Sequence, residues 1–294
     1  KGKTIRVKDG SPIGIMLALH GCNGSKWEKY DEVWAAYFNA LGLDYFAPDS
    51  FAVPRPAEVC GEVPPSRSRD YHRISRLRVA QTKKSIAELK SRYPGVPIFV
   101  FGQSEGAAIV EYIDVEVAGI IAAGDECGVS GMKIAASKAV PVLYLFGEND
   151  PYLGGFKLPV TAKKVQKCRN LVRNKKTKMV VVKSNKHAYW PWRPEIAKAV
   201  SQFLGSKSTG LVEALPYSET PTTKFKAALV AYSGGRSERA FAVGLSDFTG
   251  WAEGLEFQQD AEGLALYECV KAAGLNIFAI KKQICAIVNV NGGA

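Results

Sequence analysis

Ser104 stands at the centre of a Gly-x-Ser-x-Gly motif at residues 102–106. The motif occurs by chance in glycine-rich turns, but here it joins the apolar run 98–101 to a stretch with helical spacing. In a strand–turn–helix of this kind, small residues two positions to each side let the backbone close and raise the serine hydroxyl above the end of the strand. We therefore predict that Ser104 is a nucleophile for acyl transfer rather than an ordinary turn serine.

A serine alcohol needs a base, and the chain has only three histidines. His187 follows the predicted strand 178–183 and precedes a helical stretch, which is where a catalytic base is expected in a fold of this pattern. His72 lies among arginines at the start of a helical stretch, and we expect it at the surface. His20 is expected to be structural. His187 is therefore the predicted base.

The base in turn needs an acid that orients it. The apolar run 141–146 ends in Gly-Glu-Asn-Asp, and Asp150 is the predicted acid, with Glu148 as the alternative. The order Ser104, Asp150, His187 is the order of a catalytic triad in α/β-hydrolases, and each residue follows the end of a predicted strand.

Two backbone amides are expected to stabilise the oxyanion that forms on the attacked carbonyl. The amide of Glu105 follows the nucleophile directly. The second donor should come from the loop after an early strand, and Cys22 in the segment 19–24 (Leu-His-Gly-Cys-Asn-Gly) is the natural candidate. The alternative, that Cys22 is itself reactive, would require a lowered thiol pKa, and no neighbour in the sequence argues for one.

Three aromatic residues lie beside the predicted base: Tyr189, Trp190 and Trp192. They are candidates for lining an acyl or alcohol pocket, and packing in the core or at the surface is the alternative. No Cys-x-x-Cys motif suggests zinc, and we expect neither a metal nor an organic cofactor.

Short apolar runs alternate with amphipathic stretches from about residue 12 to residue 204, which is typical of a parallel sheet with helices on both faces. The predicted strands are residues 13–19, 44–48, 98–101, 117–123, 141–146 and 178–183. The predicted helices are residues 27–41, 72–92, 104–114, 160–171 and 194–204. The sequence therefore predicts an α/β fold with a doubly wound, mostly parallel sheet, whose ligand site lies at the carboxyl ends of the strands.

The pattern changes after residue 205. Residues 206–223 have the composition of a linker, and residues 224–294 predict a small α+β domain in the order ββαββ. Its predicted strands are residues 227–232, 240–243, 277–280 and 284–290, around one helix at 251–273. We thus expect a catalytic domain over 1–205, a linker and a second small domain.

The formal net charge is +11, and the excess of lysine and arginine lies within residues 1–205. Two basic runs contribute much of it: Arg67, Arg69, Arg73, Arg76 and Arg78, and Arg173, Lys175, Lys176 and Lys178. Such runs attract an anionic substrate, polymer or membrane surface, or they form a solvated face with no dedicated ligand. No nucleic-acid motif accompanies them, and no run is long enough to span a bilayer.

The six cysteines are placed as three local pairs, Cys22 with Cys60, Cys127 with Cys168 and Cys269 with Cys285. Three disulfides would indicate an oxidising compartment, whereas six buried thiols would indicate the cytoplasm.

These motifs resemble those of the dienelactone hydrolase family of α/β-hydrolases over residues 10–205. The segments that carry the resemblance occur in the family's order: residues 19–24, Pro-Asp-Ser-Phe at 48–51 with Arg55, residues 102–106, residues 147–150 and the histidine loop. The resemblance implies the α/β-hydrolase fold and a small hydrolase with little or no lid, acting on esters, lactones and related carbonyl compounds. Family members proper have a cysteine nucleophile, whereas residue 104 is serine, so we expect a serine esterase related to them.

The resemblance also has implications for the cellular compartment of the protein and for its C-terminal residues. Cys22 and Cys60 are similar to cysteines of exported bacterial members, which favours a periplasmic or secreted protein over a cytoplasmic one. The tail resembles a small domain of unknown function from exported bacterial proteins, through Tyr-Glu-Cys at 267–269 and Gln-Ile-Cys at 283–285.

The sequence therefore predicts a serine hydrolase that cleaves a small ester or lactone through an acyl-enzyme, and the basic charge allows for an anionic substrate. Two alternatives remain open: a serine peptidase similar to prolyl oligopeptidase, and a non-catalytic protein that binds through its C-terminal domain. The oligomeric state is left open.

Overall fold

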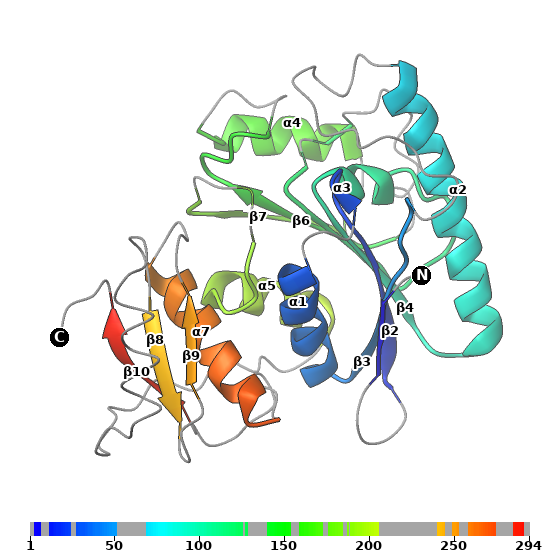
Figure 1. Cartoon of the computed structure of the whole chain (residues 1–294). Helices are drawn as coiled ribbons and strands as arrows, with labels where there is room; N and C mark the ends of the chain where they lie inside the picture. The colour runs from blue at the N-terminus through cyan, green and yellow to red at the C-terminus, as the bar shows by residue number, and fades with distance from the viewer. Residues whose placement is uncertain are drawn as a thin grey trace. The chain divides into compact units, whose positions relative to one another are not determined.

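Figure 1 shows the computed structural model of the chain. The structure describes residues 3–6, 12–24, 28–51, 69–125, 127–128, 140–153, 159–172, 176–184, 187, 189–205, 240–244, 249–252, 258–274 and 285–290.

The chain divides into two compact units whose boundary differs from the predicted one. The first unit comprises Lys1–Tyr189 and Gln202–Ser206, and the second comprises Trp190–Ser201 and Lys207–Ala294. The segment that follows the predicted catalytic histidine therefore packs with the C-terminal residues. The proposed division into a catalytic domain, a linker and a small domain remains a prediction.

The first unit contains a seven-stranded sheet. Its strands are β1 (Lys3–Ile5), β2 (Gly14–Leu19), β3 (Leu43–Ala47), β4 (Ile98–Gln103), β5 (Gly119–Ala123), β6 (Val142–Gly147) and β7 (Thr177–Val182), in the order β1-β3-β2-β4-β5-β6-β7. Six strands are parallel, and β1 runs antiparallel to β3 at the edge. The predicted mostly parallel α/β sheet is confirmed. Strand β1 was not predicted, because three residues are too short for a periodic signal.

The central strands are continuous apolar runs because helices cover both faces of the sheet. Every residue of β2, β5 and β6 is buried. On one face α1 (Glu28–Ala40) packs Trp34 and Phe38 against Phe101 of β4, with ring centroids 4.7 and 5.7 Å apart. Figure 1 shows α1 and the long helix α2 (Arg69–Arg92) on opposite sides of the sheet.

The second face carries the larger apolar cluster. Residues of α2, α3 (Glu105–Val110) and α4 (Ala162–Val172) pack there against β2, β4, β5 and β6. Because successive side chains of a strand point to opposite faces, the buried strands contribute to both cores at once. Helices packed on both faces of the sheet therefore hold the carboxyl ends of the strands in place.

Helix α3 is shorter than the predicted helix at 104–114. It ends at Val110, and the amides of Tyr112 and Ile113 continue in tighter turns to the carbonyls three residues earlier. The buried carboxylate of Glu111 accepts hydrogen bonds from the Tyr144 hydroxyl at 2.6 Å and from the Gly128 amide at 2.7 Å. These tertiary bonds draw the chain out of the helical path, and sequence periodicity does not register them.

The second unit includes a three-stranded antiparallel sheet. Strands β8 (Ala240–Gly244), β9 (Thr249–Ala252) and β10 (Cys285–Val290) follow the order β10-β8-β9, and α7 (Gln258–Ala272) packs on them. The predicted helix at 251–273 is wrong over its first two residues, which belong to β9 because residues 249–252 pair with β8. The predicted strands at 227–232 and 277–280 lie outside the described residues.

One polar cluster in the second unit centres on Asp260, which is 2% exposed near the start of α7. Its carboxylate accepts hydrogen bonds from Trp192 Nε1 at 3.0 Å and from Arg193 Nε at 2.9 Å, and it forms an ion pair with the Arg193 guanidinium. A Cβ added at Gly263 would lie 2.6 Å from the Trp192 ring, so the close approach of the indole to α7 requires glycine. Together, these contacts join 190–193 to α7.

Two of the three predicted disulfides are present. Cys127 bonds to Cys168, and Cys269 bonds to Cys285 and so joins α7 to β10. Cys22 is also disulfide-bonded, while its predicted partner Cys60 lies outside the described residues. These bonds favour an oxidising compartment.

The predicted basic runs have more than one environment. Arg73, Arg76, Lys176 and Lys178 are exposed, but Arg78 is only 1% exposed, so its assignment to a solvated or ligand-attracting face is wrong. The other members of the two runs lie outside the described side chains. Across the described ranges, no helix is both long enough and apolar enough to cross a membrane.

Candidate active site

Ser104 occupies a strained turn between β4 and α3. Its backbone has a φ of 55° and a ψ of −123°, a conformation that costs a non-glycine residue about 1–3 kcal/mol. A Cβ added at Gly102 would lie 2.3 Å from the carbonyl oxygen of Gly106, and one added at Gly106 would lie 2.3 Å from that of Leu19. Both glycines of the motif are thus required by close backbone approach, and the turn presents Ser104 at the carboxyl end of β4.

His187 is held by Asp150 through a short hydrogen bond. Nδ1 of His187 lies 2.6 Å from Oδ2 of Asp150, and the Asp150 residue is fully buried. Glu148, the alternative acid, instead pairs its backbone amide with Val182 and its carbonyl with Val160 at the end of the sheet. The geometry therefore brings Asp150 to the imidazole, in the arrangement that fixes one tautomer of a catalytic base.

The second ring nitrogen of His187 is unoccupied. Nε2 is buried and has no hydrogen-bond partner among the described residues. The Ser104 amide donates to the carbonyl of Ala123 at 2.9 Å, and a Cβ added to the next residue, Gly124, would lie 2.8 Å from His187 Cε1. Ser104 and His187 thus approach two consecutive residues at the end of β5, Ala123 and Gly124, and no hydrogen bond joins Ser104 to Nε2.

Tyr189 has a role that the sequence did not reveal. Its hydroxyl donates to the same Asp150 Oδ2 at 2.6 Å and accepts a hydrogen bond from the Gly147 amide at 2.7 Å. Its carbonyl accepts hydrogen bonds from Tyr30 and Trp34 of α1, both at 3.0 Å. The residue is fully buried, so it supports Asp150 and the segment next to His187.

We expect Tyr189→Phe to lower kcat about tenfold and to destabilise the fold by about 1–3 kcal/mol, because the Gly147 amide is left buried without a partner. Ester hydrolysis and urea unfolding measure the two effects. Tyr93→Phe is the matched control, since the Tyr93 hydroxyl is buried and has no hydrogen-bond partner in the part of the chain that the structure describes, so its removal should cost nothing. Equal effects of the two variants would show that the Tyr189 hydroxyl does no positioning.

The two tryptophans that were predicted as pocket residues are buried. Trp190 and Trp192 stack on each other with centroids 4.6 Å apart, and both belong to the second unit. Trp192 also donates to Asp260. The structure therefore places them in packing, which was the alternative interpretation.

Tyr152, by contrast, is an exposed aromatic residue beside the histidine. It is 75% exposed, and its ring centroid lies 5.0 Å from that of His187. The Tyr152 amide donates to Asp150 Oδ1 at 2.9 Å. The Asp150 side chain thus forms a turn with the backbone two residues later. The sequence signal that could have found it is the Asp-Pro-Tyr run at 150–152.

The segment predicted to supply the second oxyanion donor lies against Ser104. Residues 21–24 form a turn closed by the Gly24 amide and the Gly21 carbonyl at 3.3 Å. A Cβ added at Gly21 would lie 3.3 Å from the Cβ of Ser104. Because Cys22 is disulfide-bonded, the alternative that its thiol is reactive is wrong.

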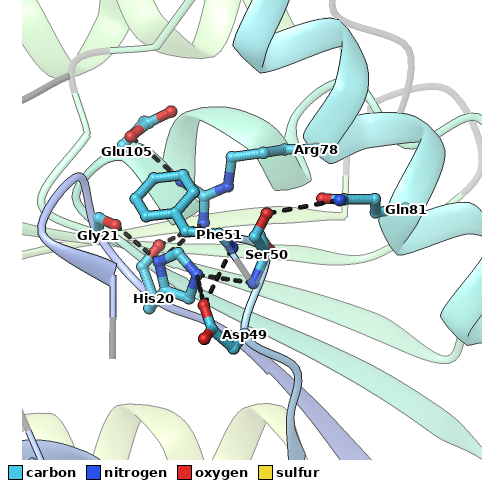
Figure 2. A network of polar contacts seen from close by, with 8 residues as sticks. All are labelled: His20, Gly21, Asp49, Ser50, Phe51, Arg78, Gln81 and Glu105. Carbon is cyan, nitrogen blue, oxygen red and sulfur yellow. Dashed lines mark hydrogen bonds and ion pairs between the residues drawn. The ribbon is translucent and has the colours of Figure 1, made fainter. Parts of the chain in front are cut away.

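A buried polar network surrounds His20 at the back of this turn (Figure 2). The Ser50 amide donates to His20 Nε2 at 3.0 Å, so Nδ1 carries the proton and donates to the Gly21 carbonyl at 2.8 Å. Arg78 lies beside the ring and donates to the His20 carbonyl at 2.5 Å. Burial, together with the Arg78 charge, lowers the pKa of His20 to about 4. His20 is structural, as predicted.

The lowered pKa has a consequence for stability. Folded protein keeps His20 neutral down to about pH 4, whereas histidine in an unfolded chain has a pKa near 6.5. The unfolded state therefore binds more protons between these values, and the free energy of unfolding should fall by up to about 3 kcal/mol as the pH drops from 6.5 to 4. Urea unfolding across this range measures the loss, which His20→Gln should reduce. The control His72→Gln should lose as much stability between pH 6.5 and pH 4 as the wild type does. If the free energy of unfolding of His20→Gln falls with pH as steeply as that of the wild type, His20 is not the group responsible.

In the described part of the chain, no cluster of three or more histidine, cysteine, aspartate or glutamate residues is placed to hold a metal ion.

No protein-family model matches the sequence, and no curated protein matches it. The fold does match solved structures. A Thermus thermophilus protein aligns with a TM-score of 0.52 at 19% identity, over 70% of this chain and 97% of that one. A cold-adapted esterase from an Arctic intertidal metagenomic library aligns with a TM-score of 0.51 at 18% identity, over 70% and 93% of the two chains.

A Klebsiella pneumoniae protein named as a candidate dienelactone hydrolase reaches a TM-score of 0.49 at 15% identity, over 69% of this chain and 90% of that one. That score is too low to support a closer assignment. At these identities the comparisons show the fold alone: an α/β fold with a mostly parallel sheet that resembles α/β-hydrolases.

Proposed function

We propose that this protein is a serine hydrolase that cleaves carboxylic esters or lactones through Ser104, His187 and Asp150. The observation that carries the proposal is the short His187–Asp150 hydrogen bond, which leaves Nε2 without a partner among the described residues, near the strained turn of Ser104. A neutral imidazole with an oriented tautomer and an open Nε2 is what a general base for a serine alcohol requires.

The proposed reaction has two steps. Ser104 Oγ attacks the ester carbonyl while His187 Nε2 accepts its proton, and Asp150 stabilises the imidazolium that forms. The amides of Cys22 and Glu105 hold the oxyanion of the tetrahedral intermediate. The imidazolium then protonates the leaving alcohol, and water activated by His187 releases the acid from Ser104.

The setting of the site favours a small substrate. The esterase among the structural matches supports an ester, and the position of Tyr152 beside the base provides an exposed aromatic surface for it. The disulfides support a periplasmic or secreted bacterial location.

A fluorophosphonate probe tests the nucleophile, because it forms a stable adduct with an activated serine. We expect one adduct per chain, mapped by mass spectrometry to Ser104. A folded sample without an adduct would overturn the proposal. Short-chain p-nitrophenyl esters and peptide anilides then test the substrate class, and faster cleavage of the anilides would replace the esterase by a peptidase.

A further inference from the structure

Arg78 reaches from α2 to both segments that flank Ser104. Its Nη1 lies 3.1 Å from Glu105 Oε2, and its Nη2 donates to the carbonyl of His20 at 2.5 Å. Figure 2 shows the single guanidinium between these two contacts. A planar group that contacts two partners at once fixes the distance between them.

The guanidinium is itself held in place. Its Cζ lies 5.3 Å from the centroid of the Phe51 ring, and that ring also meets His20 edge-on at 4.8 Å. The Arg78 side chain is 1% exposed and that of Glu105 is 3% exposed. Arg78 therefore has little freedom to move away from either contact.

Fold stability alone does not account for a charged pair at this position. Removing two charges from water costs about as much as their attraction returns, and apolar side chains of similar volume often serve a fold equally well. The positions of the two contacts suggest another role. Glu105 supplies one proposed oxyanion donor through its own amide, and His20 precedes Cys22, the other proposed donor, by two residues.

We propose that Arg78 is a positioning residue that sets the spacing of the two oxyanion amides by holding Glu105 and the His20 carbonyl at a fixed separation. This inference rests on the serine hydrolase function proposed above. An oxyanion hole acts only when both donors lie about 2.7–3.1 Å from the developing charge, so a small displacement of either one lowers kcat. Binding of the uncharged ester depends much less on that spacing.

The test separates positioning from stability with the double variant Arg78→Met/Glu105→Met. It removes both charges, keeps the backbone amide of residue 105 and fills the space with apolar side chains. We expect its Tm to lie within a few degrees of the wild-type value. We expect kcat for a p-nitrophenyl ester, and the rate of fluorophosphonate labelling, to fall about 30- to 100-fold, with KM changed less than about twofold.

Arg76→Met is the matched control, because Arg76 lies on the same helix and is exposed. It should retain both kcat and Tm. Arg78→Lys keeps the charge but contacts only one partner at a time, and it should show an intermediate kcat. That variant also keeps the proposal falsifiable if the double variant does not fold.

The outcomes distinguish the two proposals. A folded double variant with wild-type kcat, or Arg78→Lys with wild-type kcat, would overturn the positioning role and leave the hydrolase function standing. A folded wild-type protein that neither hydrolyses esters nor reacts with the probe would overturn the hydrolase function, and the positioning role with it.

Discussion

Ser104→Ala is expected to lower kcat for ester hydrolysis by about 10⁴- to 10⁶-fold and to abolish fluorophosphonate labelling. The substitution removes the only atom that becomes bonded to the substrate. Alanine keeps the Cβ, so it neither relieves nor adds strain at a φ of 55°. Urea unfolding should therefore give the same stability as the wild type, which shows that the loss is chemical.

Ser104→Gly provides the contrasting control. Glycine adopts a positive φ without steric cost, so this variant should also be inactive but more stable than Ser104→Ala by about 1 kcal/mol. Residual activity of Ser104→Ala above a few parts in 10⁴ would point to a different nucleophile. A glycine variant no more stable than the alanine variant would show that the turn stores no strain.

Asp150→Asn is expected to lower kcat by about 10⁴-fold. Asp150 accepts hydrogen bonds from three donors, His187 Nδ1, the Tyr189 hydroxyl and the Tyr152 amide. An asparagine offers one acceptor oxygen, so its amide group must face a donor in either orientation. His187 would then lose its orientation or adopt the wrong tautomer.

Glu148→Gln is the matched control for Asp150→Asn, because it makes the same chemical change two residues away. The Glu148 backbone is paired at the end of the sheet and the side chain is half-buried, so kcat should change less than about threefold. Measurement of kcat against pH for both variants decides between the two acids. A large loss in Glu148→Gln with activity retained in Asp150→Asn would reverse the assignment.

The fold was predictable where one local pattern was sufficient. Strands β2, β5 and β6 are continuous apolar runs because both their faces are buried, and each was predicted within a few residues of its observed ends. The Ser104 turn was predictable for a similar reason. Gly102 is required by a contact within the turn, with the Gly106 carbonyl, whereas Gly106 is required by the Leu19 carbonyl at the end of β2.

The remaining features depend on partners that are distant in the chain. Arg78 was assigned to a basic surface because its sequence neighbours are charged, and only Glu105 and the His20 carbonyl explain its burial. Tyr189 was a candidate for lining a pocket or for packing because it lies beside the histidine, and only the tertiary structure reveals its contact with Asp150. Trp251 and Ala252 were predicted as the start of a helix, and pairing with β8 makes them part of a strand.

The path of the chain at Trp190–Ser201 limits how this protein can be shortened or recombined. The backbone leaves the first unit three residues after His187, contributes that segment to the second unit, returns to the first and then leaves again. Truncation after Gly205, where the sequence suggests a linker, would remove Asp260 and expose an arginine and a tryptophan that need it. A circular permutant or a domain swap would meet the same obstacle, because no single cut separates the units. During synthesis, residues 190–201 leave the ribosome before α7 does, so Trp192 and Arg193 cannot bind Asp260 until α7 has been made.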